Sequence, residues 1–265
     1  MVSLHETLTE ILRGGGIEDA ALEAQWILED VQNAEKATEI AQKRANHEPL
    51  QYLLGAWEFY GMRFLVGEGV LIPRADTETL VDAVLSRLPR GQHICAADLC
   101  TGSGCIALAL KAHNPALDIC GLDFSERALA YAKKNAHLHD LNVPMLFADV
   151  CDPAVAAAHQ QLDLIVSNPP YLTGDDMASL QTEVTFEPRM ALAGGTDGLD
   201  FYRSITKNWS HSLRIGGMLA FEVGIHQAAA VAEILTDANF TDIEIIPDLC
   251  GVARVVLGYR REQKG

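Results

Sequence analysis

Residues 97–110 read ADLCTGSGCIALAL, and this stretch decides the fold. The apolar residues before Asp98 predict a buried strand that ends there, and a helix is predicted from about residue 104. Gly102 and Gly104 lie between the two, where the lack of a Cβ atom lets a ligand approach the backbone. A strand, a glycine-rich turn and a helix in this order predict a nucleotide-type binding site, although Ala107 stands where a third glycine would be.

From this turn onward, strands and helices are predicted to alternate. The predicted strands span residues 93–98, 118–123, 144–149, 162–168, 218–223, 242–247 and 253–259, and the helices span 104–113, 125–137, 199–213 and 226–239. No helix fits between the last two strands, so they are expected to form a hairpin that places one antiparallel strand in the sheet. The alternation predicts an α/β fold, a doubly wound, seven-stranded, mostly parallel sheet with its ligand at the carboxyl ends of the strands.

The part of the chain before the glycine-rich turn is predicted to have a different secondary structure. Apolar residues at helical spacing predict three short helices, up to residue 13, over 19–32 and over 34–45. Aromatic and branched residues split by glycines predict a β-hairpin linker over 49–75. Asp76 is then expected to cap a helix that runs to about residue 88. We therefore divide the chain into a small helical N-terminal domain (1–48), the linker (49–75) and a large α/β domain (76–265).

Charge and cysteine content narrow the class of protein. The 265 residues include 36 acidic and 20 basic ones, and the resulting net charge of −16 repels phosphate backbones. No apolar run reaches the ~18 residues needed to cross a bilayer, and the first residues lack the pattern of a secretory signal. The six cysteines form no Cys-x-x-Cys pair, so we expect reduced, mostly buried thiols, no metal site and a cytoplasmic location.

Two carboxylates are predicted at the ends of the strands that follow the turn. Asp123 ends the next strand, where a carboxylate can accept hydrogen bonds from both hydroxyls of a ribose. The simpler alternative is that Asp123 only caps the helix beginning at Ser125, and it leaves the upstream glycine-rich turn unexplained. Asp149 ends the third predicted strand, and either its side chain or the backbone of Val150 is expected beside an adenine.

The loop Asn168-Pro169-Pro170-Tyr171 begins at the last residue of the predicted buried strand LDLIVSN, residues 162–168. The prolines stiffen the loop, and a residue before proline is extended, so Asn168 is held at the carboxyl end of the strand. Its side-chain oxygen and the Pro169 carbonyl match the two N–H donors of a planar –NH2 group. Such hydrogen bonds orient an amide or amine nitrogen for attack on an activated methyl group, and Tyr171 is expected to stack on it. The loop predicts a methyltransferase that uses S-adenosylmethionine.

These motifs together resemble the class I methyltransferases that act on planar nitrogens, and nearly the whole chain resembles the HemK/PrmC family of release factor glutamine methyltransferases. The resemblance is carried by Pro49-Leu50-Gln51-Tyr52, Leu71-Ile72-Pro73-Arg74 with Thr77-Glu78, DLCTGSGCIALAL, VSNPPY, Glu187-Pro188, Gly195 with Asp197-Gly198-Leu199, and Arg254-Val255-Val256. Because these segments spread over the helical part, the linker and the α/β part, the resemblance is specific.

The resemblance implies a reaction and a set of site residues. The substrate would be the glutamine of the Gly-Gly-Gln motif in bacterial class 1 release factors, and its methylation modulates translation termination. The helical domain would help to hold the release factor, and S-adenosylmethionine would leave as S-adenosylhomocysteine. The implied cofactor contacts are Cys100, Thr101, Gly102, Ser103, Gly104, Asp123, Asp149, Val150 and Asn168. Asn168, Pro169, Pro170 and Tyr171 would bind the glutamine, with Asn168, Pro169 and Tyr171 as the catalytic residues.

The chain departs from the family at the cofactor turn. The family usually has glycine where this chain has Cys100, and a side chain there would crowd the methionine part of the cofactor. If the backbone at this position needs a positive φ, strain of about 1–2 kcal/mol would follow. We therefore expect weakened rather than abolished cofactor binding. Ala75-Asp76 also replaces the more usual Pro-Glu, and Arg74 and Glu78 beside it are expected to be structural.

Four alternatives remain open from the sequence. A ribosomal-protein glutamine methyltransferase would share these motifs. An adenine-specific nucleic-acid methyltransferase would share the Asn-Pro-Pro-Tyr loop, but the charge of −16 and the missing target-recognition domain disfavour it. A nicotinamide-dependent dehydrogenase would need a proton relay beside Asn168, and none is evident. An inactive binding module is suggested only by Cys100. We expect a monomer without membrane or direct nucleic-acid partners.

Overall fold

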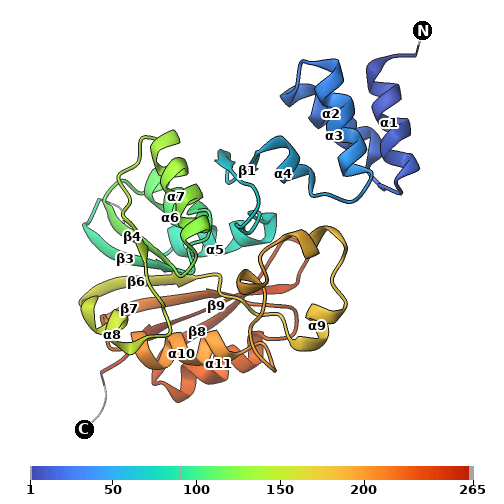
Figure 1. Cartoon of the computed structure of the whole chain (residues 1–265). Helices are drawn as coiled ribbons and strands as arrows, with labels where there is room; N and C mark the ends of the chain where they lie inside the picture. Colours follow the sequence, from blue (N-terminus) through green and yellow to red (C-terminus); the bar gives the residue numbers. More distant parts are fainter. Residues whose placement is uncertain (1, 90, 263–265) are drawn as a thin grey trace.

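The computed structural model describes residues 2–89 and 91–262. Its N-terminal helices stand apart from the part that contains the large sheet (Figure 1). Helices α1 (Leu4–Gly14), α2 (Ala20–Asp30) and α3 (Ala34–Arg44) pack around an apolar core of their own. A short helix, α4 (Leu50–Leu54), contributes Leu50 to that core. The three predicted helices are confirmed, whereas α4 was not predicted, because its five residues are too few to show a helical period.

The linker contains the predicted hairpin. Strands β1 (Ala56–Phe59) and β2 (Met62–Leu65) pair antiparallel. Phe59 and Phe64 are buried in the same core as one face of the large sheet. The hairpin is therefore packed against the α/β part of the molecule and holds residues 66–74 alongside it.

The large sheet has seven strands in the order β5-β4-β3-β6-β7-β9-β8. Its strands are β3 (Ile94–Leu99), β4 (Leu117–Asp123), β5 (Met145–Phe147), β6 (Leu162–Ser167), β7 (Leu213–Glu222), β8 (Phe240–Pro247) and β9 (Ala253–Arg260). Every pairing is parallel except the two that involve β9. The predicted seven-stranded, mostly parallel sheet with one antiparallel strand is confirmed.

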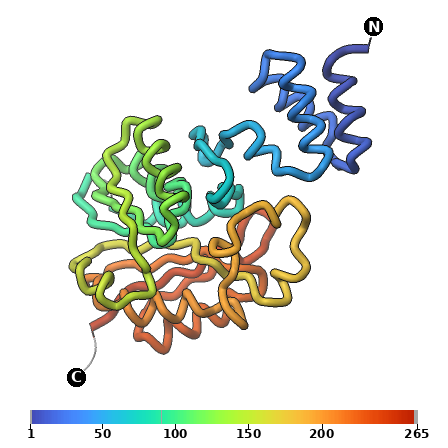
Figure 2. The backbone as a smooth tube through the Cα atoms, in the orientation of Figure 1, coloured from blue at the N-terminus to red at the C-terminus, as the bar shows by residue number. Residues whose placement is uncertain are grey.

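Helices cover both faces of this sheet. One layer contains α5 (Glu78–Leu85), α6 (Cys105–His113) and α7 (Glu126–Leu138), and the other contains α8 (Pro153–Ala158), α10 (Asp200–Trp209) and α11 (Ala228–Asp237) (Figures 1 and 2). Successive residues of β6 alternate between the two layers, with Leu164 and Val166 in one core and Ile165 in the other. This double burial explains the apolar run of β6 and makes the fold doubly wound.

Three local predictions were wrong. Asp76 does not cap a helix: it lies in the 3-10 turn η1 (Ala75–Thr77), and its carboxylate pairs with Arg254 at 2.8 Å. Strand β5 ends at Phe147, so Asp149 lies in the turn beyond the strand rather than at its end. The cysteines are free thiols as predicted, but only Cys105 is buried, and the others are partly or fully exposed.

The segment between β6 and α10 also contains elements that the sequence did not suggest. They are α9 (Gly174–Ala178), η2 (Glu183–Phe186) and η3 (Arg189–Ala191). Each is too short to show a hydrophobic period. Over residues 2–89 and 91–262, no helix combines the length and the apolar composition that a membrane crossing requires.

Candidate active site

A cavity of about 510 Å³ lies at the carboxyl ends of β3, β4 and β6, and we call it the strand-end cavity. Residues 69–74 of the linker and four residues between 188 and 193 also line it (Pro188, Met190, Ala191 and Ala193). Its lining includes Cys100, Thr101, Gly102, Ser103, Asp123, Asp149, Val150, Asn168 and Pro170. Gly104, Pro169 and Tyr171 belong to the same segments but are not part of the lining.

The two glycines of the turn have different roles. Both have a positive φ, 58° at Gly102 and 81° at Gly104. A Cβ at Gly102 would meet nothing within 4 Å, so the missing side chain leaves open space in the cavity. A Cβ at Gly104 would instead lie 3.2 Å from Ala132 and 3.1 Å from Met145. Gly104 therefore permits packing of α6 against its neighbours rather than access of a ligand.

Cys100 adopts the left-handed backbone region, with φ of 60°. A side chain costs energy there, and this cost is present before any ligand binds. The surrounding protein shields the thiol of this partly exposed residue from water, and this desolvation, with nearby Asp123 adding to it, raises the pKa of the Cys100 thiol well above its usual range. The thiol is therefore protonated at neutral pH and is a poor nucleophile.

Asp98 fixes the glycine-rich turn through hydrogen bonds, and the sequence did not reveal this role. Its Oδ2 accepts hydrogen bonds from the Thr101 hydroxyl at 2.6 Å and from the Ala107 N–H at 3.2 Å. The residue is completely buried, and burial raises its pKa to about 7 against the lowering effect of these two donors. Asp98 thus connects the end of β3 to the first turn of α6.

Asp123 fastens the turn to the end of β4. Its Oδ2 accepts the Gly102 N–H at 2.8 Å, and its Oδ1 accepts the Ser125 N–H at 2.8 Å. The side chain that caps α7 is that of Ser125, which accepts from the Ala128 N–H. Burial raises the pKa of Asp123, while these backbone donors act to lower it. The carboxyl group therefore sits at the cavity wall in a fixed orientation.

An aromatic side chain, that of Phe124, forms part of the cavity wall. Phe124 lines the cavity and stacks on Phe147, with ring centroids 5.3 Å apart and an interplanar angle of 26°. Both phenylalanines are 56% exposed, although burial is the usual state of such residues. Val150 is buried nearby, and its carbonyl accepts from Trp209 Nε1 at 2.8 Å. Phe124 was missed from the sequence, where its only signal was its place directly after Asp123.

The Asn168 loop presents two unused acceptors. Asn168 Nδ2 donates to the Thr77 hydroxyl oxygen at 3.3 Å. Within the described residues, no hydrogen bond ends on Asn168 Oδ1 or on the Pro169 carbonyl. Asn168 itself is partly buried and lines the strand-end cavity. The amide therefore has its donor side engaged by protein and its acceptor side free.

Tyr171 anchors the loop rather than lining the cavity. Its backbone carbonyl accepts from Gln227 Nε2 at 2.9 Å, and its ring lies beside Gly224. Burial raises the pKa of the Tyr171 hydroxyl to about 12. Next along the chain, Leu172 exchanges backbone hydrogen bonds with Leu192 and Gly194. Tyr171 does not line the strand-end cavity, and its stacking on a ligand stays a prediction.

A second cavity of about 570 Å³, which we call the polar cavity, lies between the N-terminal helices and the segment 181–187. It shares Ile72 and Arg74 with the strand-end cavity, so the two adjoin. At this boundary, buried Glu187 accepts the Ile72 N–H at 3.0 Å and pairs with Arg74. Carboxylates outnumber guanidinium groups in the lining of the polar cavity. The carboxylates belong to Glu18, Asp19, Glu23, Glu183 and Glu187, and the guanidinium groups to Arg44 and Arg74.

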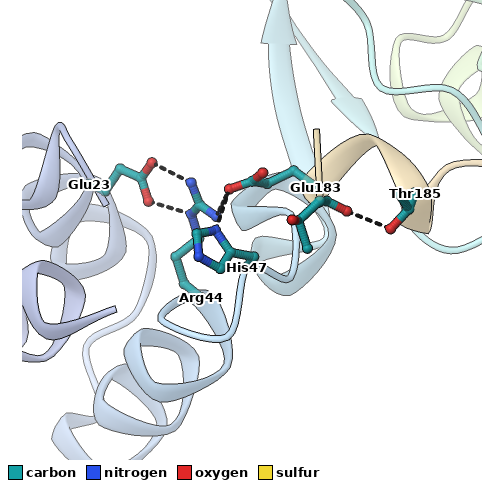
Figure 3. A network of polar contacts seen from close by, with 6 residues as sticks. Glu23, Arg44, His47, Glu183 and Thr185 are labelled. Carbon is teal, nitrogen blue, oxygen red and sulfur yellow. Dashed lines mark hydrogen bonds and ion pairs between the residues drawn. The ribbon is translucent and has the colours of Figure 1, made fainter. Parts of the chain in front are cut away.

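An ion-pair network ties helix α3 to η2 across the polar cavity (Figure 3). The Arg44 guanidinium donates to Glu23 at 2.7 Å and to Glu183 at 2.9 Å. His47 Nδ1 also lies 2.8 Å from Glu183. Partial burial acts to raise the pKa of Glu183, but hydrogen bonds from His47 and Arg44 hold it at about 2. The network joins the N-terminal helices to η2, which precedes the residues between 188 and 193 that line the strand-end cavity.

Comparison with known proteins gives consistent findings. Residues 75–195 match the family described as "Methyltransferase small domain". A release factor glutamine methyltransferase of Geobacter sulfurreducens is 39% identical over 262 residues, covering 92% of this chain and 90% of that protein. Another, of Neisseria gonorrhoeae, is 42% identical over 229 residues, covering 84% and 81%. A methyltransferase structure from Pyrococcus furiosus has a TM-score of 0.58 at 15% identity, covering 77% of this chain and 91% of that one, so it shares the fold.

Proposed function

The chain belongs to the family of release factor glutamine methyltransferases, and we propose that it methylates the glutamine side-chain amide in the Gly-Gly-Gln motif of bacterial class 1 release factors, which modulates translation termination. The methyl donor in this proposal is S-adenosylmethionine. One observation carries the proposal: Asn168, whose side-chain oxygen is free, lines the same cavity as the glycine-rich turn, and the free carbonyl of Pro169 follows it directly in the chain.

The residues of the strand-end cavity fit S-adenosylmethionine. Gly102 leaves open space at the wall, and the buried Ser103 hydroxyl has no partner among the described residues, so it is available to a ligand. Asp123 would accept from the ribose hydroxyls, and Phe124 would cover a face of the adenine. We retain Cys100, Thr101, Asp149, Val150 and Asn168 as further contacts, whereas Gly104 shapes the turn. When bound, the cofactor supplies an electrophilic methyl group on a sulfonium.

The Asn168 loop would hold the target amide. Asn168 Oδ1 and the Pro169 carbonyl accept the two N–H bonds of the glutamine side chain, and this fixes the direction in which the nitrogen faces. The same two acceptors stabilise the positive charge that develops on the nitrogen during attack. No general base is needed beforehand, because the methylated nitrogen loses its proton readily. Pro170 lines the strand-end cavity, and Tyr171 anchors the loop through the hydrogen bond between its carbonyl and Gln227.

The polar cavity would receive the part of the release factor that flanks the glutamine. It adjoins the strand-end cavity, and its exposed carboxylates Glu18 and Asp19 suit a segment with positive charge. We propose accordingly that residues 1–48 hold the protein substrate, that residues 49–75 connect, and that residues 76–265 carry out methyl transfer. A protein substrate also agrees with the net charge of −16 better than a nucleic acid does.

Intact-protein mass spectrometry tests the proposed function. Unmethylated release factor is incubated with the chain and S-adenosylmethionine, and we expect the mass of one methyl group to be added at the glutamine of the Gly-Gly-Gln motif. Asn168→Ala should remove most of this gain. Parallel incubations contain a glutamine-bearing ribosomal protein and adenine-containing DNA. Preferential methylation of either of these would overturn the assignment of the substrate.

A further inference from the structure

Strand register places Glu222 beside Asn168. Ser167, the last residue of β6, pairs with Phe221 of the parallel strand β7. The next residue after Ser167 is Asn168, directly beyond β6, and the next after Phe221 is Glu222, the last residue of β7. Both therefore emerge at the same edge of the sheet, where the strand-end cavity lies. Thr77, at the end of η1, reaches the same place, because it accepts the hydrogen bond from Asn168 Nδ2.

Glu222 is a buried carboxyl group with an unused oxygen. The residue is 2% exposed, and its Oε2 has no hydrogen-bond partner among the described residues. Burial raises its pKa to about 7, while the nearby side chains of Thr77, Arg254 and Asn168 act to lower it. An unsatisfied buried carboxylate is costly, and a packed apolar side chain would avoid that cost. Its position next to Asn168 suggests that a role in the function of Asn168 offsets this cost.

The charged and titratable groups around Glu222 leave its carboxylate available. Arg254 on β9 is the nearest cation, and it is already paired with Asp76 at 2.8 Å and Asp248 at 3.1 Å. Other titratable groups near Glu222 are Tyr171, Tyr202 and Cys105, and burial raises the pKa of each, so that they are protonated at neutral pH. The Tyr202 hydroxyl donates to the backbone carbonyl of Glu222, not to its side chain. The carboxylate is thus free to accept from Asn168.

We propose that Glu222 is a positioning residue for the methyl transfer, and that it acts by fixing the orientation of the Asn168 side-chain amide. The Thr77 hydroxyl oxygen accepts one N–H bond of Asn168 Nδ2, and in this proposal the Glu222 carboxylate accepts the other. With both protons directed at protein, Oδ1 must face the cavity, where the substrate amide needs an acceptor. A protonated Glu222 could donate to Oδ1 instead, and the amide would then turn its own N–H donors toward those of the substrate. The inference rests on the proposed function for its kinetic consequences.

Glu222→Gln tests this inference, because glutamine keeps the shape of the side chain and removes its charge. We expect kcat to fall by about 10- to 100-fold, since misorientation of a catalytic group has effects of this size. The KM for release factor and the affinity for S-adenosylmethionine, measured by calorimetry, should change little. In the unsubstituted protein kcat should rise with pH as Glu222 ionises, and Glu222→Gln should remove that rise. Glu222→Asp should restore part of it.

A matched control is Glu244→Gln on β8, an equal change of charge at an exposed glutamate that pairs with Arg87. It should leave kcat and its pH profile unchanged. A Glu222→Gln variant with normal kcat and a normal pH profile would overturn the inference. So would a variant that loses thermal stability and cofactor affinity together with kcat, because that pattern indicates a structural role only.

A measurement without turnover separates this inference from the proposed function. The side-chain NH2 signals of Asn168 in nitrogen-15 NMR spectra should shift as Glu222 titrates, and should not shift over that pH range in Glu222→Gln. If no methyl transfer to release factor is seen but these shifts occur, the proposed substrate fails while the positioning contact stands. Signals in the unsubstituted protein that are insensitive to pH would refute the contact itself.

Discussion

The backbone N–H of Gly102 donates to Asp123 Oδ2 at 2.8 Å, so the glycine-rich turn and the end of β4 are joined without any ligand. The carboxyl group that is proposed to bind ribose is therefore held in place by the turn that is proposed to bind the methionine part of the cofactor. Such preorganisation lowers the entropy that binding has to remove. It also means that a change at Asp123 alters both regions of the site.

Asp123→Ala should weaken binding of S-adenosylmethionine by about 10- to 100-fold, the range for loss of hydrogen bonds to a charged group. Asp123→Asn should lose less, because it keeps one acceptor oxygen. Isothermal titration calorimetry measures both. Asp118→Asn, at the exposed opposite end of β4, is the matched control and should bind normally. Equal affinities for all variants would exclude Asp123 as a cofactor contact.

Cys100→Gly should stabilise the fold. The strain of the left-handed conformation is present in the free protein, so its relief should raise the free energy of unfolding by about 1 kcal/mol. Cofactor affinity should improve only to the extent that the side chain crowds the ligand, and we expect a few-fold. Urea unfolding and calorimetry separate the two effects. Cys250→Gly, at an exposed position without positive φ, should give no gain in stability.

Phe124→Ala should reduce affinity for S-adenosylmethionine by about 3- to 10-fold, the contribution expected of one aromatic contact. Phe147→Ala is a graded comparison, because Phe147 stacks on Phe124 but does not itself line the cavity. Its effect should be smaller. Fluorescence or calorimetric titration measures both, and a larger loss for Phe147→Ala would place the adenine elsewhere.

Stability should respond to pH through Glu222. Its folded-state pKa of about 7 lies above its ordinary value of 4.5, so its protonated form favours folding. That contribution is complete below about pH 4.5 and is lost as pH rises through 7. The glutamine in Glu222→Gln does not titrate, so this variant keeps its stability while the unsubstituted protein loses the contribution of Glu222. The free energy of unfolding of the variant, relative to that of the unsubstituted protein, should therefore rise by more than about 1 kcal/mol between pH 5 and pH 8. Urea unfolding at the two pH values measures this, and a constant difference would contradict the raised pKa.

Local sequence patterns sufficed for much of the fold and part of the site. The apolar run of β6 predicts a strand buried on both faces because each of its residues must face a layer of helices. Asn168 could be placed because the strand and the prolines that fix it are its immediate neighbours. Asp123 could be placed because it ends a strand that follows a glycine-rich turn.

The local prediction for Asp76 was wrong for a physical reason. An aspartate before an apolar helical stretch is a reasonable helix cap, since its side chain can accept free backbone N–H bonds. In the folded chain, Asp76 meets Arg254 of β9, and an ion pair with a distant strand replaces the local hydrogen bond. No pattern near residue 76 contains that information.

The sequence by itself determined which elements form and which loops carry chemistry, because hydrophobic period, glycine and proline act over a few residues. Only the tertiary structure decided which side chains share a site. Glu222 looks like one more acidic residue at the end of a strand, and Phe124 like one more apolar residue in a turn. Glu222 becomes a neighbour of Asn168 because β7 lies next to β6 in the sheet, and strand order depends on contacts between residues far apart in the chain.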